Sequence, residues 1–493
     1  MNSEHDGWYR ALCARDARFD GLFFVGVTTT GIYCRPVCSA RTPGRDRCCF
    51  FTSAAAAERE GFRPCLRCRP ELAPGHAPVD AVRTLARVAA ARIEAGALNN
   101  GHSLEDLARE LGLGGRQLRR SMRRELGVAP VELAQTRRLL LAKQLLTETD
   151  LPVARVVHAS GFKSVRRFNA LFRDRYGLTP SALRRTADAP QPANRVRLML
   201  AYRPPYAWDA LLRFLAARCT NGVEVVAGNA YIRTTTIGEH RGRLRVTPIC
   251  GRDALALELD AGLMPVLPDV LARLRNLFDL DARPDVIAEH LRGDADLGRS
   301  LARTPGLRVP GTFDGFELAV RAILGQRVSV RAATTLAGRL ATAFGTPFED
   351  IDGGLDRIAP TATQLAEVET GDLRALGIGP TQAAAIQSLA RAVTAGEIDL
   401  APGAHPEEMI RKLQELPGIG EWTAQYVAMR TLRWPDAFPA GDLGLLKAAG
   451  MRTPRALQRR AEAWRPWRAY AAMVLWESLS NLERTVLLEA SSR

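Results

Sequence analysis

The sequence predicts a multidomain, mostly α-helical protein with two smaller parts that contain β-strands. Helical periodicity covers residues 80–186 and returns from about residue 268 to the end. Between these segments, residues 195–265 alternate apolar and polar positions, as in EVVAGNAYIRTTTI, which is typical of an antiparallel sheet. Residues 1–75 are rich in Cys, Gly, Pro and aromatic residues, so we expect a small α+β domain there.

Two segments without periodicity separate these parts and predict linkers, PELAPGHAP at 70–78 and ADAPQPAN at 187–194. A chain of 493 residues has room for about three or four domains. We predict four, which cover residues 1–78, 79–187, 195–267 and 268–493.

The composition is that of a folded protein that stays inside the cell. Apolar residues make up 46% of the chain and charged residues 25%, which is typical of globular proteins. We find no uncharged apolar run of about 18 residues that would cross a membrane. The start, MNSEHDGWYR, lacks the basic and apolar regions of an export signal. We therefore predict a cytoplasmic location, where cysteines stay reduced.

The positive charge is concentrated at the front of the chain. The net charge is +15, and residues 1–187 carry +13 of it. This distribution predicts that the front part binds a polyanion, for which DNA is the first candidate. The rear part would bind DNA through a local surface.

Four cysteines have the spacing of a tetrahedral zinc site. Three residues separate Cys34 from Cys38, and two separate Cys65 from Cys68. Most such sites only hold a small domain together, but one thiolate can also be a nucleophile. Basic residues surround the pairs: Arg35, Arg41, Arg45, Arg47, Arg63, Arg67 and Arg69. The remaining cysteines are predicted not to be ligands: Cys13, Cys48, Cys49, Cys219 and Cys250.

The helical region contains the same unit twice, at 103–130 and 151–180. Each unit has a short helix, a turn with Gly, a basic helix and the ending Gly-x-x-Pro, which predicts two helix-turn-helix units. The alternatives are a charged helix that only faces solvent and a two-helix unit that only contacts protein, but the duplication, the shared Gly-x-x-Pro ends and the arginines favour DNA binding. We predict DNA contacts from Gln117 and Arg120 in the first basic helix and from Arg166 and Arg167 in the second.

LPGIGEWTAQY predicts a helix-hairpin-helix near the end of the chain. Gly418 and Gly420 allow the tight turn and leave amides free at the start of the second helix, where a phosphate binds well. By itself such a motif can be a passive DNA clamp.

Asp442 follows this hairpin by about twenty residues, in FPAGDLGLLK. It could be only a helix N-cap. It could also face the sugar of an extruded nucleotide and stabilise an oxocarbenium-like centre, or orient the attacking water. Trp422, Tyr426 and Trp476 supply aromatic faces that suit a cationic alkylated purine, although each one alone would more often be a core residue.

TTTGIYCRPVCSAR and GFRPCLRCRPE resemble the N-terminal domain of the Ada family over roughly residues 5–75. The resemblance implies that Cys34 accepts a methyl group from a methylphosphotriester in DNA, with Cys38, Cys65 and Cys68 as companion ligands. Four thiolates on Zn(II) carry a formal charge of about −2, which methylation reduces to about −1. Weaker repulsion from phosphates would then strengthen DNA binding and switch the protein on.

Two further resemblances cover the rest of the chain. ASGFKSVRRFNALFRDRYGLTPSALRR resembles the closing signature of AraC-type transcription regulators. About 197–480 resembles the 3-methyladenine DNA glycosylase II family, through RVPGTFDGFELAVRAILGQRVSV, LPGIGEWTAQY and the GD of FPAGDLGLLK. This implies Asp442 as the catalytic carboxylate and Trp422, Tyr426 and Trp476 as walls of the base pocket. It also implies Val309 as the apolar wedge that fills the gap left by the flipped base.

Absent residues restrict the chemistry. Trp422 stands where strand-cleaving relatives of this fold carry a lysine, so no Schiff base is expected. No cysteine follows Cys250, which excludes a C-terminal iron–sulfur cluster. The Pro-Cys-His-Arg acceptor motif of the Ada family's C-terminal half is also absent, so we expect no O6-methylguanine transfer.

The sequence thus predicts a zinc-dependent DNA alkylation repair protein with three activities. These are a monofunctional DNA-3-methyladenine glycosylase, a stoichiometric methylphosphotriester methyltransferase, and a DNA-binding transcription activator. The predicted partners are alkylated DNA, operator DNA and RNA polymerase. One alternative is a methylation-sensing activator whose rear domain is a silent DNA clamp. Another is an enzyme whose front half is only an anchor, with a structural Cys34.

Overall fold

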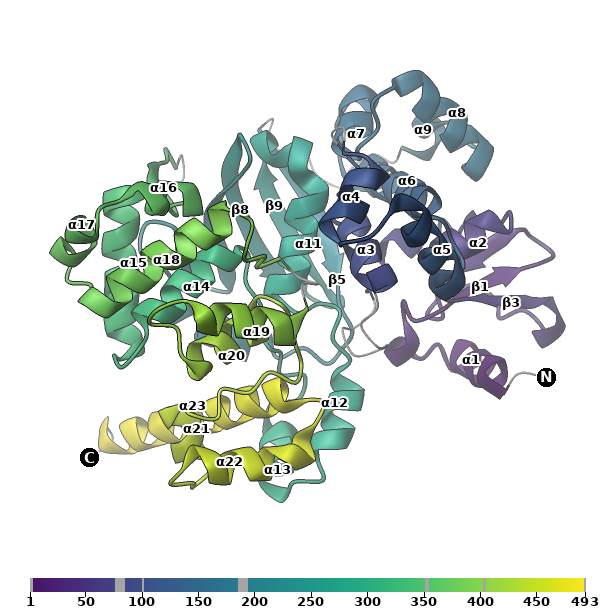
Figure 1. Ribbon diagram of the computed structural model, residues 1–493. Coiled ribbons are helices and arrows are strands. Elements are labelled where there is room, and N and C mark those ends of the chain that lie inside the picture. Colours follow the sequence, from purple (N-terminus) through teal and green to yellow (C-terminus); the bar gives the residue numbers. More distant parts are fainter. Residues whose placement is uncertain are drawn as a thin grey trace. The chain divides into compact units, whose positions relative to one another are not determined.

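The structure is a computed structural model that describes residues 3–75, 85–99, 102–184, 194–350, 354–401 and 405–491. It shows a multidomain, mainly helical chain with small sheets, as predicted (Figure 1). The predicted linker at 187–194 lies almost wholly outside the described residues, as does the end of the one at 70–78. The division into four domains stays a prediction.

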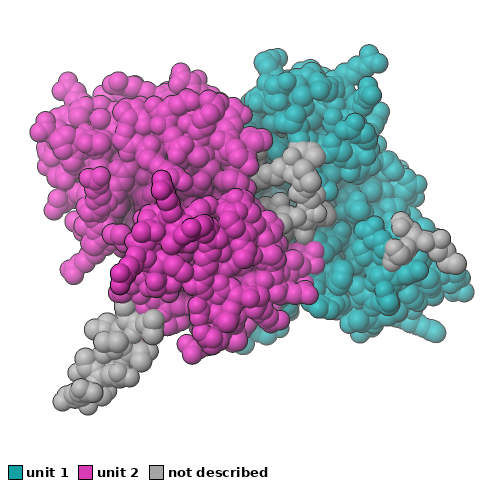
Figure 2. Space-filling model, turned by 60° about the horizontal axis from the view of Figure 1, so that its bottom comes forward, with its two compact units in different colours: residues 1–204, 237–242, 249–272 teal, residues 205–236, 243–248, 273–493 magenta. Residues whose placement is uncertain are grey.

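The chain forms two compact units (Figure 2). Unit 1 comprises residues 1–204, 237–242 and 249–272. Unit 2 comprises residues 205–236, 243–248 and 273–493.

Unit 1 begins with a four-stranded sheet in the order β3-β1-β2-β4. β1 pairs antiparallel with β2 and β3, whereas β2 and β4 run parallel. Phe23 and Tyr33 are fully buried and form the small core on either side of this sheet. The elements are α1 (Ser3–Ala14), β1 (Phe24–Val27), β2 (Ile32–Cys34), β3 (Cys48–Phe51), α2 (Ala54–Arg59) and β4 (Arg63–Pro64).

The helices α3 to α9 follow in the described part of residues 85–184, and they contain the repeated unit. Both basic helices, α5 and α8, end at a glycine in the left-handed region, Gly127 at φ 71° and Gly177 at φ 66°. Pro130 and Pro180 then start the next helix, which explains the shared Gly-x-x-Pro. The helices are α3 (Leu85–Glu94), α4 (Leu104–Glu110), α5 (Gly115–Leu126), α6 (Pro130–Glu148), α7 (Val153–Ala159), α8 (Val165–Tyr176) and α9 (Pro180–Leu183).

The long helix α6 joins the other parts of unit 1. Thr136, near its start, donates to Glu58 of α2 across 2.8 Å. At its end, Gln144 donates to the carbonyl of Met199 across 2.9 Å, and Glu148 accepts from the amide of Met199 across 2.9 Å. Met199 lies in β5 (Arg195–Ala201), so α6 is bonded both to the N-terminal domain and to this strand.

Residues 195–260 form the predicted antiparallel strands, with sheet order β5-β9-β8-β7-β6. β5 pairs with β9 from Arg195↔Asp260 to Ala201↔Ala254, and β6 pairs with β7. The elements are β5 (Arg195–Ala201), α10 (Trp208–Ala216), β6 (Glu224–Ala227), β7 (Ala230–Ile237), β8 (His240–Pro248) and β9 (Ala254–Asp260).

The described residues that follow are helical apart from loops and one short strand pair, which the periodicity did not predict. This pair is β10 (Thr346–Pro347) with β11 (Arg357–Ile358). The helices are α11 (Leu267–Leu277), α12 (Pro284–Leu291), α13 (Ala295–Arg303), α14 (Gly315–Leu324), α15 (Val330–Phe344), α16 (Ala362–Glu367), α17 (Thr370–Ala375), α18 (Pro380–Thr394), α19 (Pro406–Glu415), α20 (Glu421–Arg430), α21 (Leu443–Ala448), α22 (Pro454–Ala461) and α23 (Arg468–Ser491). Within the described residues, none combines the length and apolar character that a membrane crossing requires.

Candidate functional site

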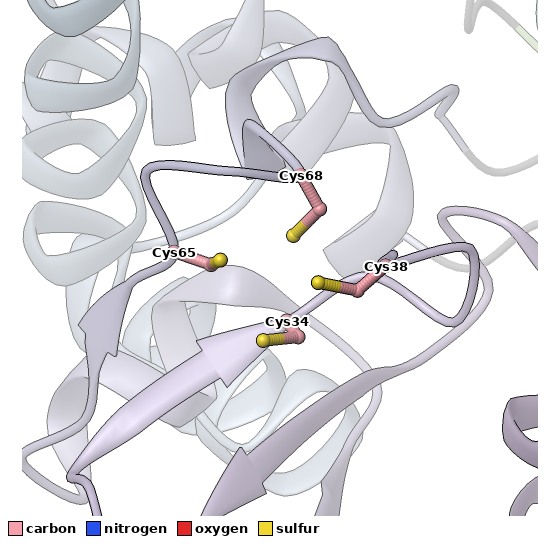
Figure 3. A group of neighbouring side chains, drawn as sticks. All are labelled: Cys34, Cys38, Cys65 and Cys68. Carbon is pink, nitrogen blue, oxygen red and sulfur yellow. The ribbon is translucent and has the colours of Figure 1, made fainter. Parts of the chain in front are cut away.

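The four predicted zinc ligands meet at one end of the N-terminal sheet. β2 ends at Cys34, and Cys65 directly follows β4, which runs parallel beside it. The amide of Cys65 donates to the carbonyl of Tyr33 across 3.0 Å, so both cysteines leave neighbouring strands at the same level. Cys38 and Cys68 lie on the loops that follow, and all four side chains point toward one another (Figure 3).

This cysteine cluster fits one tetrahedral metal ion. All four Sγ atoms lie within 4.8 Å of one another. Zn–S bonds of about 2.3 Å would place the sulfur atoms about 3.8 Å apart, which small side-chain rotations reach. Cys38 and Cys65 are buried, and Cys34 and Cys68 are half-buried. In the described part of the chain, no other group of His, Cys, Asp and Glu has this geometry.

Arg35 supports the cysteine cluster through Cys68. Its amide donates to Sγ of Cys68 across 3.3 Å, and its guanidinium donates to the carbonyl of Cys68 across 3.1 Å. The same guanidinium forms an ion pair with Asp20. On the other side, Lys143 of α6 donates to the carbonyl of Cys65 across 3.3 Å. The ligand loops are therefore fixed by both the small domain and α6.

Only some of the arginines around the cysteine cluster are free of ion pairs and could bind a phosphate. Arg35 and Arg69 are used in ion pairs with acidic residues of unit 1. Arg41 and Arg67 are exposed, and neither forms an ion pair within the described ranges. Arg67 lies in the turn between Cys65 and Cys68, so its charge remains next to the cluster.

The residues predicted to contact DNA from the two basic helices are all exposed. Gln117 and Arg120 lie on α5, and Arg166 and Arg167 lie on α8. The opposite faces are buried: Leu118 and Met122 on α5, and Phe168 and Phe172 on α8, are 0% exposed. Apolar packing therefore leaves the basic side chains facing outward.

The helix-hairpin-helix consists of α19, the turn at 416–420 and α20. Gly418 has φ 80°, and a Cβ there would lie 3.1 Å from Cβ of Ala385 and from the carbonyl oxygen of Thr381. Both the backbone conformation and the space therefore require glycine. Gly420 is the N-cap of α20. Neither glycine's amide donates to another group of the described chain, so both are available to a phosphate.

Asp442 is the N-cap of α21, and its carboxylate also binds two indoles. Oδ1 accepts from the amide of Leu445 across 2.9 Å and from Nε1 of Trp476 across 3.0 Å. Oδ2 accepts from Nε1 of Trp422 across 3.0 Å. The capping role and the proposed catalytic role are thus compatible, because the cap and the Trp476 indole bond to Oδ1, whereas Oδ2 accepts one bond and keeps a free lone pair.

Trp422, Tyr426 and Trp476 form one aromatic cluster around this carboxylate. Trp422 and Tyr426 are stacked, with ring centroids 5.4 Å apart and an interplanar angle of 9°. Trp476 lies edge-on to Tyr426, with centroids 6.2 Å apart. The structure therefore brings together Asp442 and the three aromatic residues that the sequence predicts as walls of the base pocket. The arrangement offers π faces and a negative group in one place, which suits a cation.

Comparison with known sequences matches the chain in four consecutive segments. Residues 7–71 match the metal binding domain of Ada, and residues 107–186 match a helix-turn-helix domain. Residues 197–314 match the AlkA N-terminal domain. Residues 320–468 match the HhH-GPD superfamily of base excision DNA repair proteins.

One relative matches the chain over almost its whole length. The "probable bifunctional transcriptional activator/DNA repair enzyme AlkA" of Mycobacterium tuberculosis strain H37Rv is 40% identical over 490 residues, which cover 98% of each chain. The chain belongs to this AlkA-type family of bifunctional activator and repair proteins.

The rear half of this AlkA-type chain also resembles free-standing enzymes. The "DNA-3-methyladenine glycosylase 2" of Escherichia coli K12 is 39% identical over 277 residues, which are 56% of this chain and 95% of the relative. The solved structure of a 3-methyladenine DNA glycosylase from Archaeoglobus fulgidus superposes with a TM-score of 0.51 at 21% identity. The superposition covers 57% of this chain and 98% of that structure, and it supports the fold of the rear half.

Val309, the predicted wedge of the AlkA-type chain, is buried. Its side chain is 8% exposed, and its amide lies 3.4 Å from Oδ2 of Asp279. A wedge must protrude to enter a base stack, so this burial argues against Val309 in that role. The structure therefore gives no support to the prediction that Val309 is the wedge.

An exposed loop beside the hairpin has the properties that Val309 lacks. Arg327 is exposed and adopts φ 58°, which is strained for a residue with a side chain. The side chain of Gln326 holds this loop to the hairpin by donating to the carbonyl of Gly418 and to Oγ1 of Thr423, each across 2.9 Å. No motif in the sequence identified Arg327, because local pattern reports neither exposure nor backbone strain.

Residues near the aromatic cluster were also missed by the sequence reasoning. Arg430 lies one turn after Tyr426 on α20, and its NH1 donates to the Tyr426 hydroxyl oxygen across 2.5 Å. The ring centroids of Phe214, in α10, and Trp476 are 6.4 Å apart. The guanidinium carbon of Arg218 lies 3.7 Å from the centroid of the Phe214 ring. Helical spacing could have indicated Arg430. Phe214 and Arg218 are distant in sequence, and only folding brings them here.

Proposed function

We propose that this protein repairs alkylated DNA in two ways and uses one of them to control transcription. Its rear half hydrolyses the N-glycosidic bond of bases of the 3-methyladenine type. Its Cys34 takes a methyl group from methylphosphotriesters, and its two helix-turn-helix units bind DNA. The observation that carries the first activity is the carboxylate of Asp442, which is bonded to the indoles of both Trp422 and Trp476.

The glycosylase reaction needs little acid catalysis. Alkylation at N3 gives the base a positive charge, so it leaves with the electron pair of the glycosidic bond as a neutral molecule. The aromatic cluster would hold the cationic base by its π faces. Asp442 would stabilise the positive charge that develops at the sugar and orient the water that attacks C1′. The product is an abasic site. The DNA strand stays intact, because Trp422 occupies the position of the lysine whose amine would form a Schiff base.

Duplex DNA would be held by the hairpin and opened by the neighbouring loop. The amides of Gly418 and Gly420 would bind a backbone phosphate. Arg327, and not Val309, would fill the gap that the extruded nucleotide leaves, because Arg327 is exposed on a loop bonded to the same hairpin. Val328 and Val330, which are 42% and 44% exposed, give this loop an apolar side that suits unstacked bases.

At the cysteine cluster, the Cys34 sulfur would attack the methyl carbon of the phosphotriester. The carbon–oxygen bond breaks, the phosphodiester leaves as an anion, and the sulfur becomes a thioether. Zn²⁺, bound by the four cysteines, would keep the sulfur deprotonated near neutral pH. The exposed side chains of Arg41 and Arg67 would attract the phosphate backbone. RNA polymerase is the partner that the activator function requires.

Release of 3-methyladenine from alkylated DNA tests the glycosylase. The wild-type protein should release the base, and Asp442→Asn should not. If the wild type releases none, the rear half is only a DNA clamp. Mass spectrometry after incubation with methylphosphotriester DNA tests the transferase. It should find one added methyl group on the peptide that contains Cys34, and an unmodified peptide would reduce the cysteines to a structural role.

A further inference from the structure

Three arginines surround the phenol of Tyr426. Arg430 donates to its oxygen across 2.5 Å from the next turn of α20. Arg218, which follows α10, and Arg321 of α14 add positive charge near the same oxygen. Burial alone would raise the pKa of Tyr426, but the charges of Arg430, Arg218 and Arg321 outweigh it and lower the pKa below its usual value of 10.0.

These cations have no acidic partner among the described residues. Arg430 is only 3% exposed, and its other donors go to the carbonyls of Pro310 and Gly311. Arg321 donates to the hydroxyls of Thr334 and Thr220, and Arg218 donates to the carbonyl of Phe214. Arg430 is buried, whereas Arg218 and Arg321 are half-buried, and a buried charge without a counterion is costly, so a negative group beside Arg430 would be stabilising.

Within the described residues, no carboxylate forms an ion pair with Arg430, Arg218 or Arg321, and Glu317 of α14 pairs with Arg233 across 2.7 Å. Asp442, at the cap of α21, is bonded to the indoles of Trp422 and Trp476. Glu477 of α23 pairs with Arg213 across 2.8 Å. The oxygen of Tyr426 is the group that Arg430 contacts directly and that can become an anion.

We propose that Tyr426 is a specificity-determining residue whose phenol oxygen is ionised against Arg430 and Arg218, and that this negative charge selects cationic alkylated bases over neutral ones. The proposal rests on the glycosylase function proposed above. A phenolate ring is more electron-rich than a phenol ring, so it attracts a cationic purine more strongly. Arg430 is a positioning residue, because it acts through Tyr426 and not on the base.

The sign of the pH dependence follows from this assignment. Tyr426 releases its proton as pH rises through its lowered pKa, so the preference for cationic bases should grow as pH rises. A neutral phenylalanine has no such transition. Selectivity in a Tyr426→Phe variant should therefore be flat over the same range.

Ultraviolet titration of the full-length protein tests the ionisation without any need for activity. Of the eight tyrosines, four are buried, and burial raises their pKa values well above 10.0: Tyr33, Tyr176, Tyr231 and Tyr470. We expect an early phenolate transition that Tyr426→Phe removes. Arg430→Met should move it upward by about one to three pH units, and Arg430→Lys should restore it partly. Identical curves for wild type and Tyr426→Phe would overturn the proposal.

Because Arg430 is buried, its replacement can unfold the protein, so Arg218→Met is the second variant. It should shift the same transition upward while circular dichroism shows an intact fold, and an unshifted transition in a folded Arg218→Met would contradict the proposal.

Excision kinetics then give the functional readout. The ratio of kcat/KM for 3-methyladenine to that for hypoxanthine, a neutral base, should fall roughly two- to thirtyfold in Tyr426→Phe. An unchanged ratio would show that Tyr426 is only a wall. Failure of all excision with an intact early transition would instead reject the glycosylase function.

Discussion

Nε1 of Trp422 donates to Oδ2 of Asp442 across 3.0 Å. Trp422 lies in the first turn of α20, directly after the hairpin, whereas Asp442 caps α21. The bond therefore fixes the carboxylate relative to the helix that follows the phosphate-binding turn. The glycines proposed to bind the DNA backbone and the carboxylate proposed to act on the sugar are therefore held in a fixed relation, which is what a positioned catalytic group requires.

Replacing Asp442 separates its two roles. Asp442→Asn keeps an oxygen for the amide of Leu445 but removes the charge, so we expect a large loss of base release, on the order of a hundredfold or more, with little change in stability. Asp442→Ala should lose activity and also about 0.5–2 kcal/mol of stability with the cap. Single-turnover excision and thermal melts measure the two effects. Full activity in a folded Asp442→Asn would exclude the catalytic role.

The two indoles can be compared with each other. Trp422→Phe keeps an aromatic face against Tyr426 but removes one hydrogen bond to the carboxylate, and Trp476→Phe removes the other. Each should lower excision by roughly tenfold, the equivalent of one hydrogen bond to a charged group. Substrate binding to a non-cleavable duplex should change much less. Equal losses in binding and turnover would point to stacking alone.

The two wedge candidates predict opposite patterns. Arg327→Ala should slow excision from fully paired duplex DNA and have a smaller effect on a base in a bulge, because less unstacking is then needed. Val309→Ala should instead cost about 1–3 kcal/mol of stability by truncating a buried side chain. Excision from paired and bulged substrates, with a melt of each variant, distinguishes them. A selective loss on paired DNA in Val309→Ala would restore the sequence-based assignment.

Methylation of Cys34 should raise the affinity for DNA. The formal charge of the zinc–thiolate cluster changes from about −2 to about −1, so repulsion from phosphates weakens. The gain should shrink as salt rises, since the interaction is screened. Affinity of the methylated and unmethylated protein at several salt concentrations measures this. Cys13→Ser, at an exposed cysteine outside the cluster, is the control and should respond to methylation as the wild type does.

Glu58 should make stability depend on pH. It is 3% exposed and accepts from Tyr33 across 3.0 Å and from Thr136 across 2.8 Å, and burial raises its pKa above 4.5. The stability contributed by a group with a raised folded pKa is full below the unfolded pKa and is lost as pH rises through the folded value. Glutamine does not titrate. The melting temperature of Glu58→Gln relative to wild type should therefore increase from about pH 4.5 toward neutrality, and a constant difference would refute the assignment.

Predictions from sequence succeeded where a motif is short or periodic. The spacing of Cys34, Cys38, Cys65 and Cys68 indicated one ligand set, and parallel pairing of β2 with β4 brings the two pairs together. Spacing from the hairpin was enough to associate Asp442 with its aromatic neighbours. Val309 was assigned from its motif alone, and a motif does not report that its side chain is buried.

Residue types and spacing determined the metal ligands, the repeated basic helices, the hairpin glycines and the family, because each depends on neighbours within a few turns of chain. Tertiary structure alone decided that Arg218 and Phe214 lie beside Tyr426, that Arg430 has no acidic partner among the described residues, and that Arg327 protrudes where Val309 does not. Burial and charge compensation are properties of segments brought together by folding, so no local pattern contains them.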